Sequence, residues 1–247
     1  MIGLVDLHCH VHPGVDDGPR DAEECIELLQ ALFAAGVRTL AATSHVRPDH
    51  GWMNTAPGEP ERARRLEELR ASAGVEVQIV RGAEHYTHDA VFGDLDRFGD
   101  LAVPYGSSRW VLVEAPYLGL PPTFAELLFA LHRRGFRVLL AHVERFPYLE
   151  GDEALLARLH AMGVRFQVNL GSFSGAHGRM QQKAAQRLLK AGQISVLAGD
   201  THRAADVERN IVEGLSALRK LADEATLRRL CIDGPQAILD NALPERL

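Results

Sequence analysis

The segment IGLVDLHCHVHPGVDDG, residues 2–18, decides the expected fold. It begins with Ile2–Leu7, a short apolar run of the kind found in a buried β-strand. It continues into a stretch rich in histidine and aspartate. Alternate residues of an extended segment point to the same side, so His8 and His10 project together while Cys9 points away. A polar HxH directly after a buried strand predicts a site at the carboxyl end of that strand.

A short apolar run followed by polar residues recurs along the whole chain. Helical spacing of apolar residues follows most of these runs. Strands are expected at Ile2–Leu7, Val37–Thr43, Val75–Val80, Trp110–Val113, Phe136–Ala141, Val164–Asn169 and Ile194–Ala198. Helices are expected at 21–35, 60–73, 123–134, 152–162, 178–191, 204–222 and 225–239. This alternation predicts parallel strands joined by right-handed crossovers.

Both a (β/α)-barrel and an open doubly wound sheet would satisfy this alternation, and the polar residues favour the barrel. Six of the seven predicted strands end in a histidine, aspartate or glutamate, whereas an open sheet would gather such groups at one switch point. The strand-end groups are His8, His10, His45, Glu84, Glu114, His142, Asp200 and His202, and the sixth strand ends in Asn169. We therefore expect an α/β fold of the (β/α)-barrel class, forming one domain over residues 1–247.

These strand-end residues have the chemistry of a metal site. The DxH pair at 200–202 shares one side of its segment, as the HxH pair at 8–10 does, and the first and last strands of a closed barrel are neighbours. A mixed set of imidazoles and carboxylates favours a borderline transition metal, and the lack of thiolate ligands argues against a structural zinc site. The acidic pair Asp16-Asp17, flanked by glycines, is expected in a tight loop over the barrel mouth.

The composition restricts the function. Acidic residues (33) outnumber basic ones (27), and the net charge of −6 argues against a general nucleic-acid or membrane-surface binder. No apolar run approaches the length of a membrane span, and the N-terminus lacks the features of a signal peptide. Three cysteines without paired spacing fit a reducing cytoplasm. We expect a cytoplasmic protein, and an oligomer is compatible with the sequence.

The run HCHVHPGVDDG at 8–18 resembles the polymerase-and-histidinol-phosphatase (PHP) superfamily of metal-dependent phosphoesterases. Within that superfamily, four motifs are similar to those of the bacterial capsule-locus tyrosine phosphatases: HPGVDDG at 12–18, ATSH at 42–45, AHVER at 141–145 and GDTH at 199–202. The resemblance extends from about residue 1 to about residue 241 and implies a distorted (β/α)7 barrel. The stretch 47–57 is less typical of the family.

The resemblance implies three bound divalent metal ions, with manganese favoured and iron or zinc as alternatives. It divides the ligands into three sets: His8, His10, Glu84 and Asp200; then Glu84, Glu114 and His142; then Asp17, His45 and His202. Arg145 matches a family arginine that contacts the substrate phosphate. His202 could instead donate a proton to the leaving group, but not while it ligates a metal.

The same resemblance implies hydrolysis of phosphomonoesters, above all phosphotyrosine in proteins, by a metal-bound water. Three divalent ions carry six positive charges and the four ligating carboxylates four negative ones, so the remainder matches a phosphomonoester dianion. The implied partner is a phosphoprotein, such as the tyrosine-rich tail of a bacterial kinase that controls polysaccharide export. No arginine follows Cys9 at the spacing that cysteine-based phosphatases use, which argues against that chemistry.

Three alternatives stay open. A small-metabolite phosphatase acting on a compound such as histidinol phosphate would share the metal ligands and differ at the substrate rim. An amidohydrolase would use one or two metals and a lone final aspartate, whereas Asp17 and the DxH ending favour a third metal. A catalytically silent binding module would not need nine aligned ligand groups. The histidines without a role here are expected to be exposed: His12, His50, His85, His88 and His177.

Overall fold

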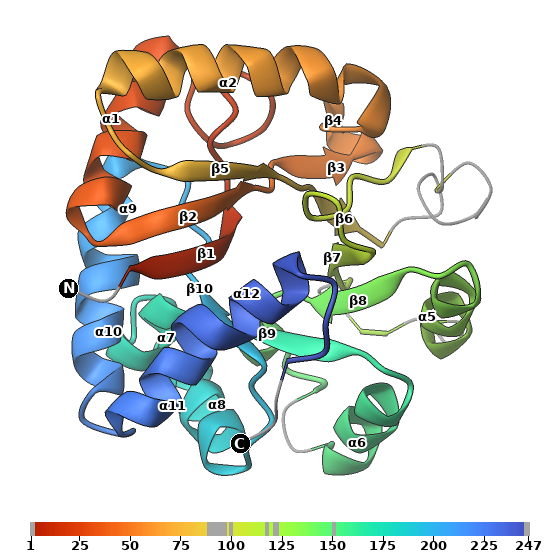
Figure 1. Cartoon of the computed structure of the whole chain (residues 1–247). Coiled ribbons are helices and arrows are strands. Elements are labelled where there is room, and N and C mark those ends of the chain that lie inside the picture. Colours follow the sequence, from red (N-terminus) through yellow and green to blue (C-terminus); the bar gives the residue numbers. More distant parts are fainter. Residues whose placement is uncertain are drawn as a thin grey trace.

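The computed structural model describes residues 3–87, 98, 101–116, 119–120, 124–149 and 152–244 (Figure 1). The strands are β1 (Leu4–Cys9), β2 (Val37–Ala42), β3 (His45–Arg47), β4 (Trp52–Met53), β5 (Gln78–Arg81), β6 (Glu84–Tyr86), β7 (Trp110–Glu114), β8 (Arg137–Leu140), β9 (Arg165–Asn169) and β10 (Val196–Ala198). The α-helices are α1 (Ala22–Ala34), α2 (Glu59–Ala73), α5 (Phe124–Arg133), α6 (Glu153–Ala161), α7 (Leu170–Ser174), α8 (Arg179–Lys190), α9 (Ala204–Val207), α10 (Glu213–Leu218), α11 (Glu224–Arg228) and α12 (Gly234–Leu239).

The parallel strands close into a barrel. They form a sheet β1-β2-β5 and a sheet β10-β9-β8-β7-β6-β3-β4, in which only β4 runs antiparallel to its neighbour. The ends of β1 and β10 are joined by two hydrogen bonds, from the Asp200 amide to the His8 carbonyl (2.8 Å) and from the His10 amide to the Thr201 carbonyl (3.0 Å). All seven predicted strands are present, so the barrel interpretation is confirmed.

Two interruptions distort the barrel. After Thr43 and Ser44 the chain of β2 continues as β3, and β5 continues as β6 in the same way, each time with new pairing partners. The buried Asn54 spans both interruptions, because its Nδ2 donates to the carbonyl oxygens of Ser44 (2.8 Å) and Gly82 (3.1 Å). A Cβ at Gly82 would lie 3.1 Å from the side chains of Thr43 and Tyr105, so glycine permits this close approach.

The amino end of the barrel is filled by an apolar cluster. It joins strand residues to the last helix: Val5, Leu7, Ala41, Tyr105, Trp110, Leu112, Leu139, Ala141, Val196 and Ile238. Ile238 belongs to α12, which contacts β1 and β10 and crosses in front of the strands in Figure 1. The indole Nε1 of Trp110 donates to the Ala242 carbonyl (3.0 Å), which fixes the chain after α12. The carboxyl end is therefore the end left for a site.

Amphipathic helices cover the outside of the strands, and α1 shows how the sequence places them (Figure 1). Asp21 caps its first turn by accepting a hydrogen bond from the Glu24 amide (3.0 Å). The buried stripe on α1 is Cys25, Leu28, Leu29 and Leu32. Burying each leucine contributes about 1.5–3 kcal/mol. Gly36, with φ of 98°, then reverses the chain into β2.

Among the described residues, the structure differs from the predicted elements in several places. Residues 170–174, which lie between the predicted strand 164–169 and the predicted helix 178–191, form the short helix α7. The predicted helix 204–222 consists of α9, a π-helical turn and α10, and it ends at Leu218. The antiparallel pair of β3 and β4 was not predicted. No helix in the described part of the chain is both long and apolar enough to cross a membrane.

Candidate metal centre

The carboxyl end of the barrel gathers all nine predicted ligands. They come from six of the seven barrel strands, or the loops directly after them: His8, His10, Asp17, His45, Glu84, Glu114, His142, Asp200 and His202. The strand interruptions help to bring them together, because β3 begins at His45 and β6 begins at Glu84, and these two residues are register partners. The distorted region of the barrel is thus part of the site.

Glu84 lies at the centre of this cluster and is almost fully buried. Its Oε2 is 3.1 Å from Nε2 of His8 and 3.1 Å from Nδ1 of His45. The same oxygen is 3.4 Å from Nε2 of His10, and Oε1 is 2.9 Å from Nε2 of His142. One carboxylate therefore contacts four imidazoles that come from three strands, β1, β3 and β8, or the residues just after them.

Asp200 forms a second carboxylate contact with the same imidazoles. Its Oδ1 is 3.3 Å from Nε2 of His8 and 3.5 Å from Nε2 of His10. Its Oδ2 accepts hydrogen bonds from Asn169 (2.8 Å) and Arg145 (3.1 Å). The two oxygens of Asp200 thus have separate roles, one facing the histidines and one held by side-chain donors.

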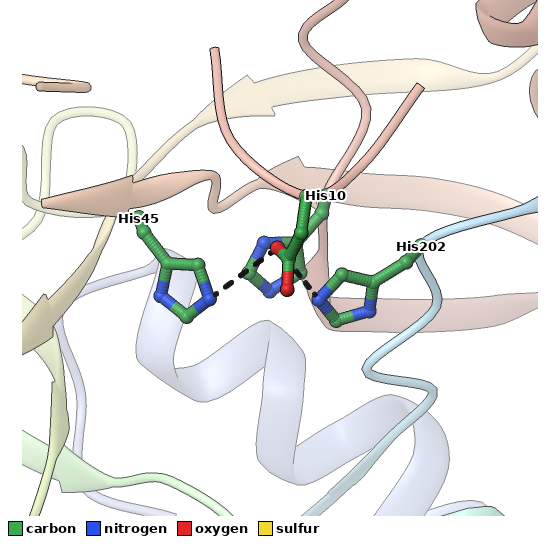
Figure 2. A group of neighbouring side chains, drawn as sticks. His10, His45 and His202 are labelled. Atoms are coloured by element: carbon green, nitrogen blue, oxygen red, sulfur yellow. Dashed lines mark ion pairs between the residues drawn. The ribbon is translucent and has the colours of Figure 1, made fainter. Parts of the chain in front are cut away.

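Asp17 belongs to a group of candidate ligands nearer the solvent, together with His10, His45 and His202. Its Oδ1 lies 3.3 Å from Nε2 of His202 and 3.7 Å from Nε2 of His45. Figure 2 shows the imidazoles of His10, His45 and His202 turned toward one another, and the rings of His10 and His202 stack with centroids 3.9 Å apart. Glu114 lies at the other side of the cluster, 3.8 Å from Nε2 of His142.

Two of these residues have an unusual backbone. His142 has φ of 30° and Asp200 has φ of 50°, both in the left-handed region that favours glycine. Strained backbone at a non-glycine residue persists only where the surroundings hold it, and it is concentrated at functional sites. Both residues directly follow a barrel strand, so the strain turns their side chains into the mouth.

The buried charges of the cluster shift the pKa values of its histidines in opposite directions. Burial opposes the imidazolium of His8, but Glu84 and Asp200 outweigh it and raise the pKa of His8 to about 9. Against the same effect of burial, Asp16 and the other carboxylates raise the pKa of His10 well above its usual range. Burial lowers the pKa of His45 to about 4, and burial together with Arg145 lowers the pKa of His142.

The carboxyl groups divide in the same way. Although burial works in the opposite direction, nearby histidines hold the pKa values of Glu84 and Asp200 well below the usual range. Burial and the neighbouring charge of Glu84 raise the pKa of Glu114 to about 8. Protons on His8, His10 and Glu114 thus balance much of the negative charge when no cation does.

The residues fit bound metal ions. Four groups of ligand atoms lie within 4.8 Å of one another: His10, Asp17, His45 and His202; His8, His10 and Asp200; His8, Glu84 and His142; His45, Glu84 and Glu114. Nε2 of His8 lies 3.2 Å from Nε2 of His10, and the buried Oε2 of Glu114 has no hydrogen-bond partner among the described residues. Imidazole nitrogens and carboxylate oxygens that face one another in this way are the ligands that a divalent cation binds.

Sequence reasoning missed three buried residues that contact the predicted ligands. Asp16, considered only as a loop residue, accepts a hydrogen bond from Nδ1 of His10 (2.8 Å) and another from the His45 amide (2.8 Å). Gln167 and Asn169 on β9 form hydrogen bonds to ligands from three other strands. The DDG motif was a signal for Asp16, whereas Gln167 lies inside an apolar run and gave none.

Several expectations about histidines were wrong. His12 and His85 are buried, and Nδ1 of His85 lies 2.9 Å from the Leu112 carbonyl oxygen. His177 is half-buried, with Nδ1 3.1 Å from Oγ of Ser172. The burial of His85 involves Phe98 and Leu112, which are distant in the sequence. His50 is exposed as expected, and His88 lies outside the described residues.

A barrel with imidazoles and carboxylates at the carboxyl ends of nearly all its strands is typical of proteins that bind metal at the barrel mouth. Within this class the chain belongs to the capsular polysaccharide synthesis, CpsB/CapC, family, whose sequence profile matches residues 4–240. The family resemblance expected from the motifs is therefore confirmed.

Named relatives agree with this assignment. The tyrosine-protein phosphatase YwqE of Bacillus subtilis is 27% identical over 217 residues, covering 88% of this chain and 84% of YwqE. The tyrosine-protein phosphatase CpsB of Streptococcus pneumoniae is 27% identical over 253 residues, covering 97% of this chain and all (100%) of CpsB.

Solved structures show the same relationship. A crystal structure reported for YwqE and CpsB, described as unique metal-dependent tyrosine phosphatases, matches with a TM-score of 0.87 and 25% identity, covering 99% of this chain and 97% of that one. Histidinol phosphate phosphatase from Lactococcus lactis shares the fold, with a TM-score of 0.54 at 15% identity, covering 87% of this chain and 94% of that one.

Proposed function

We propose that this chain is a metal-dependent phosphomonoesterase and that its substrate is phosphotyrosine in proteins. The observation that carries the proposal is the cluster around Glu84, where four imidazoles contact one buried carboxylate in a family whose named relatives are tyrosine-protein phosphatases. Carboxylates and imidazoles that face one another at such short distances have the geometry of a site for several cations.

Three divalent ions, manganese in the first place, are the proposed cofactor. The proposed ligand sets follow the family resemblance, and all nine residues occur in the groups of neighbouring ligand atoms: His8, His10, Glu84 and Asp200; Glu84, Glu114 and His142; and Asp17, His45 and His202. Each set contains ligand atoms within 3.8 Å of one another. When bound, such ions supply a hydrolytic nucleophile at neutral pH and stabilise charge on the phosphate oxygens.

Arg145 is proposed to orient the phosphate. It lies in a 3₁₀ turn directly after His142, and its Nη1 is held by Oδ2 of Asp200 at 3.1 Å. About a third of its side chain is exposed at the mouth, so the guanidinium is accessible from the solvent side. A guanidinium offers paired donors that match two phosphate oxygens. His202, a quarter exposed, is proposed as a metal ligand or as a proton donor to the leaving oxygen.

The entrance supports an aryl substrate. Arg47 and Tyr86 each lie two residues beyond a cluster member, so they share its side of the strand. The guanidinium of Arg47 lies over the Tyr86 ring at 4.2 Å, and Trp52 stacks on His45 with centroids 5.1 Å apart. A phenolic leaving group has a pKa of about 10 and departs more readily than an alkoxide. Aromatic and cationic side chains therefore surround the place where a phosphotyrosine ring would enter.

The proposed partner is a phosphoprotein in the cytoplasm, such as the tyrosine-rich tail of a kinase that controls polysaccharide export. The match to a capsular polysaccharide synthesis family supports the pathway. All three cysteines are buried and unpaired, which is consistent with a reducing compartment.

One purified sample tests the proposal. Metal per chain is counted by elemental analysis, and hydrolysis of p-nitrophenyl phosphate, a phosphotyrosine peptide, a phosphoserine peptide and histidinol phosphate is measured with and without chelator. We expect two to three metals per chain and chelator-sensitive turnover that favours the phosphotyrosine peptide. Turnover of histidinol phosphate alone would replace the substrate with a small metabolite, and a chain that takes up no added manganese and shows no turnover would overturn the enzyme assignment.

A further inference from the structure

Strand β9 is the exception in the barrel, because it ends in amides and not in a charged ligand. Gln167 and Asn169 alternate along β9, so both side chains point to the same side. Both residues are completely buried at the carboxyl end of the barrel, against the ligand cluster. Burying two amides without hydrogen-bond partners would cost several kcal/mol. The hydrogen bonds that these two amides form therefore indicate their role.

The two amides form one chain with a fixed direction. The backbone N–H of His142 can only donate, so the Gln167 atom 2.8 Å away is its oxygen, Oε1. Nε2 of Gln167 then donates to Oδ1 of Asn169 (2.7 Å). Nδ2 of Asn169 in turn donates to Oδ2 of Asp200 (2.8 Å). Every amide atom in the chain has a partner of the right kind, so neither amide can be reversed without losing hydrogen bonds.

This direction determines which atoms of two ligands face the cluster. Oε1 of Gln167 also lies 3.1 Å from Nδ1 of His8, so that nitrogen carries a proton and donates. The lone pair of Nε2 is then left for the cluster. At the Asn169 end of the chain of hydrogen bonds, Nδ2 of Asn169 donates to Oδ2 of Asp200. Oδ1 of Asp200 is then left to face the imidazoles of His8 and His10.

We propose that Gln167 and Asn169 are positioning residues of the metal centre, acting as a single relay that sets the tautomer of His8 and the orientation of Asp200. The inference rests on the metal centre described under the proposed function. It assigns to β9 a role that its lack of charged ligands conceals, and it links ligands from β1, β8 and β10 through two uncharged side chains of one strand.

The experiment measures manganese affinity of the full chain after removal of metal by chelator. The variants are Gln167→Met, Asn169→Leu and their combination, which roughly keep side-chain volume but remove the amides. Gln167→Glu keeps the oxygen that orients His8. Asn210→Ala, at a buried amide on the π-helical turn without a hydrogen bond to a ligand, is the control. The melting temperature of each chelated variant reports folding separately.

We expect each single variant to weaken the Kd for manganese by about 10- to 100-fold, as loss of a residue that orients a ligand does. The double variant should be no weaker than the poorer single, because both belong to one relay. Gln167→Glu should bind at least about threefold more tightly than Gln167→Met, since the His8 acceptor is kept. The control should stay within about threefold of the unmodified chain.

Two outcomes among the variants would overturn the inference. One is an unchanged manganese affinity in variants whose melting temperature falls, which would make the amides purely structural. The other is single effects that multiply in the double variant, which would make the two residues independent. An unmodified chain that binds manganese but hydrolyses no phosphate ester would overturn the proposed function and leave the relay to be decided by these affinities. A chain that binds no metal overturns both.

Discussion

Oδ2 of Asp16 lies 2.8 Å from Nδ1 of His10, and the same oxygen accepts a hydrogen bond from the His45 amide. Oδ1 of Asp16 accepts the Gly18 amide at 3.0 Å. The two imidazoles of the HxH motif are therefore held by different chemistry, since His8 is held by the neutral amide of Gln167. A carboxylate behind a ligating histidine makes the ligand more basic and fixes its ring.

Asp16→Asn should weaken metal binding although Asp16 is not a predicted ligand. The amide nitrogen of the variant must face either the Gly18 amide or the two donors from His10 and His45, so a hydrogen bond is lost in either orientation. We expect manganese affinity to fall by about 10- to 100-fold with the chain still folded. Calorimetric titration measures this, and an affinity equal to that of the unmodified chain would show that Asp16 serves only the loop.

Cys9→Ala should leave phosphatase turnover within about threefold of the unmodified chain. Cys9 is fully buried between two predicted ligands, and its Sγ lies 3.4 Å from the Thr201 carbonyl oxygen. Burial, together with the negative charges of Asp6 and Asp200, raises the pKa of this thiol well above its usual range, so it cannot serve as a nucleophile near neutral pH.

The buried Cys25 provides the matched control for this variant, as Cys25→Ala removes a similar thiol from helix α1. Each substitution should cost about 1 kcal/mol of stability, the average for a point mutation. Turnover is compared at equal metal content. Abolished turnover in the Cys9 variant alone, with its metals retained, would revive a cysteine-based mechanism.

The sequence predicted most of the barrel because most strands are short apolar runs that follow a glycine-terminated helix. It also predicted that the candidate ligands would lie together, since strand ends of a parallel barrel meet at one mouth. It did not predict the interruptions at Ser44 and Gly82, which depend on Asn54 reaching both strands from a distant turn. The roles of Gln167 and the burial of His85 were missed for the same reason, as both depend on residues that are distant in the sequence.

Metal binding should release protons. In the chelated protein the pKa of His8 is raised to about 9 and that of His10 lies well above its usual range, so both carry a proton at pH 7. Ligation requires the neutral imidazole. Glu114, whose pKa is raised to about 8, is also protonated at pH 7 and must lose its proton to ligate. We therefore expect about three protons released per chain at pH 7, and an apparent affinity that rises with pH up to about 9. Titration calorimetry in buffers of different ionisation enthalpy counts the protons, and a count of zero would contradict these assignments.

The same groups set how the stability of the chelated chain depends on pH. An unfolded histidine loses its proton near pH 6.5, whereas folded His8 keeps it to about pH 9. The folded state therefore binds more protons in this window, and the free energy of unfolding falls as pH rises through it. Folded Glu114, whose pKa is raised to about 8, acts in the same direction. The loss is of the order of 3 kcal/mol for His8 alone, or roughly 5–10 °C in melting temperature.

Thermal unfolding between pH 6.5 and 9, with chelator and with saturating manganese, checks this dependence. Because bound cations would replace these protons, the loaded chain should lose much less stability over the same range. A chelated chain whose melting temperature rises with pH would contradict the sign, and equal slopes with and without metal would show that these groups do not ligate.

Arg145→Ala should reduce kcat/KM for p-nitrophenyl phosphate by about 10²- to 10³-fold, the usual effect of removing one donor that stabilises a developing charge. Nη1 of Arg145 also holds Oδ2 of Asp200, but Asn169 holds the same oxygen, so metal content should be retained. Arg145→Lys keeps the charge and loses the paired donors, and it should recover only part of the activity. Activity is therefore measured together with metal per chain. Partial recovery in Arg145→Lys at full metal content would support recognition by the paired donors, whereas full activity of Arg145→Ala would remove Arg145 from the phosphate site.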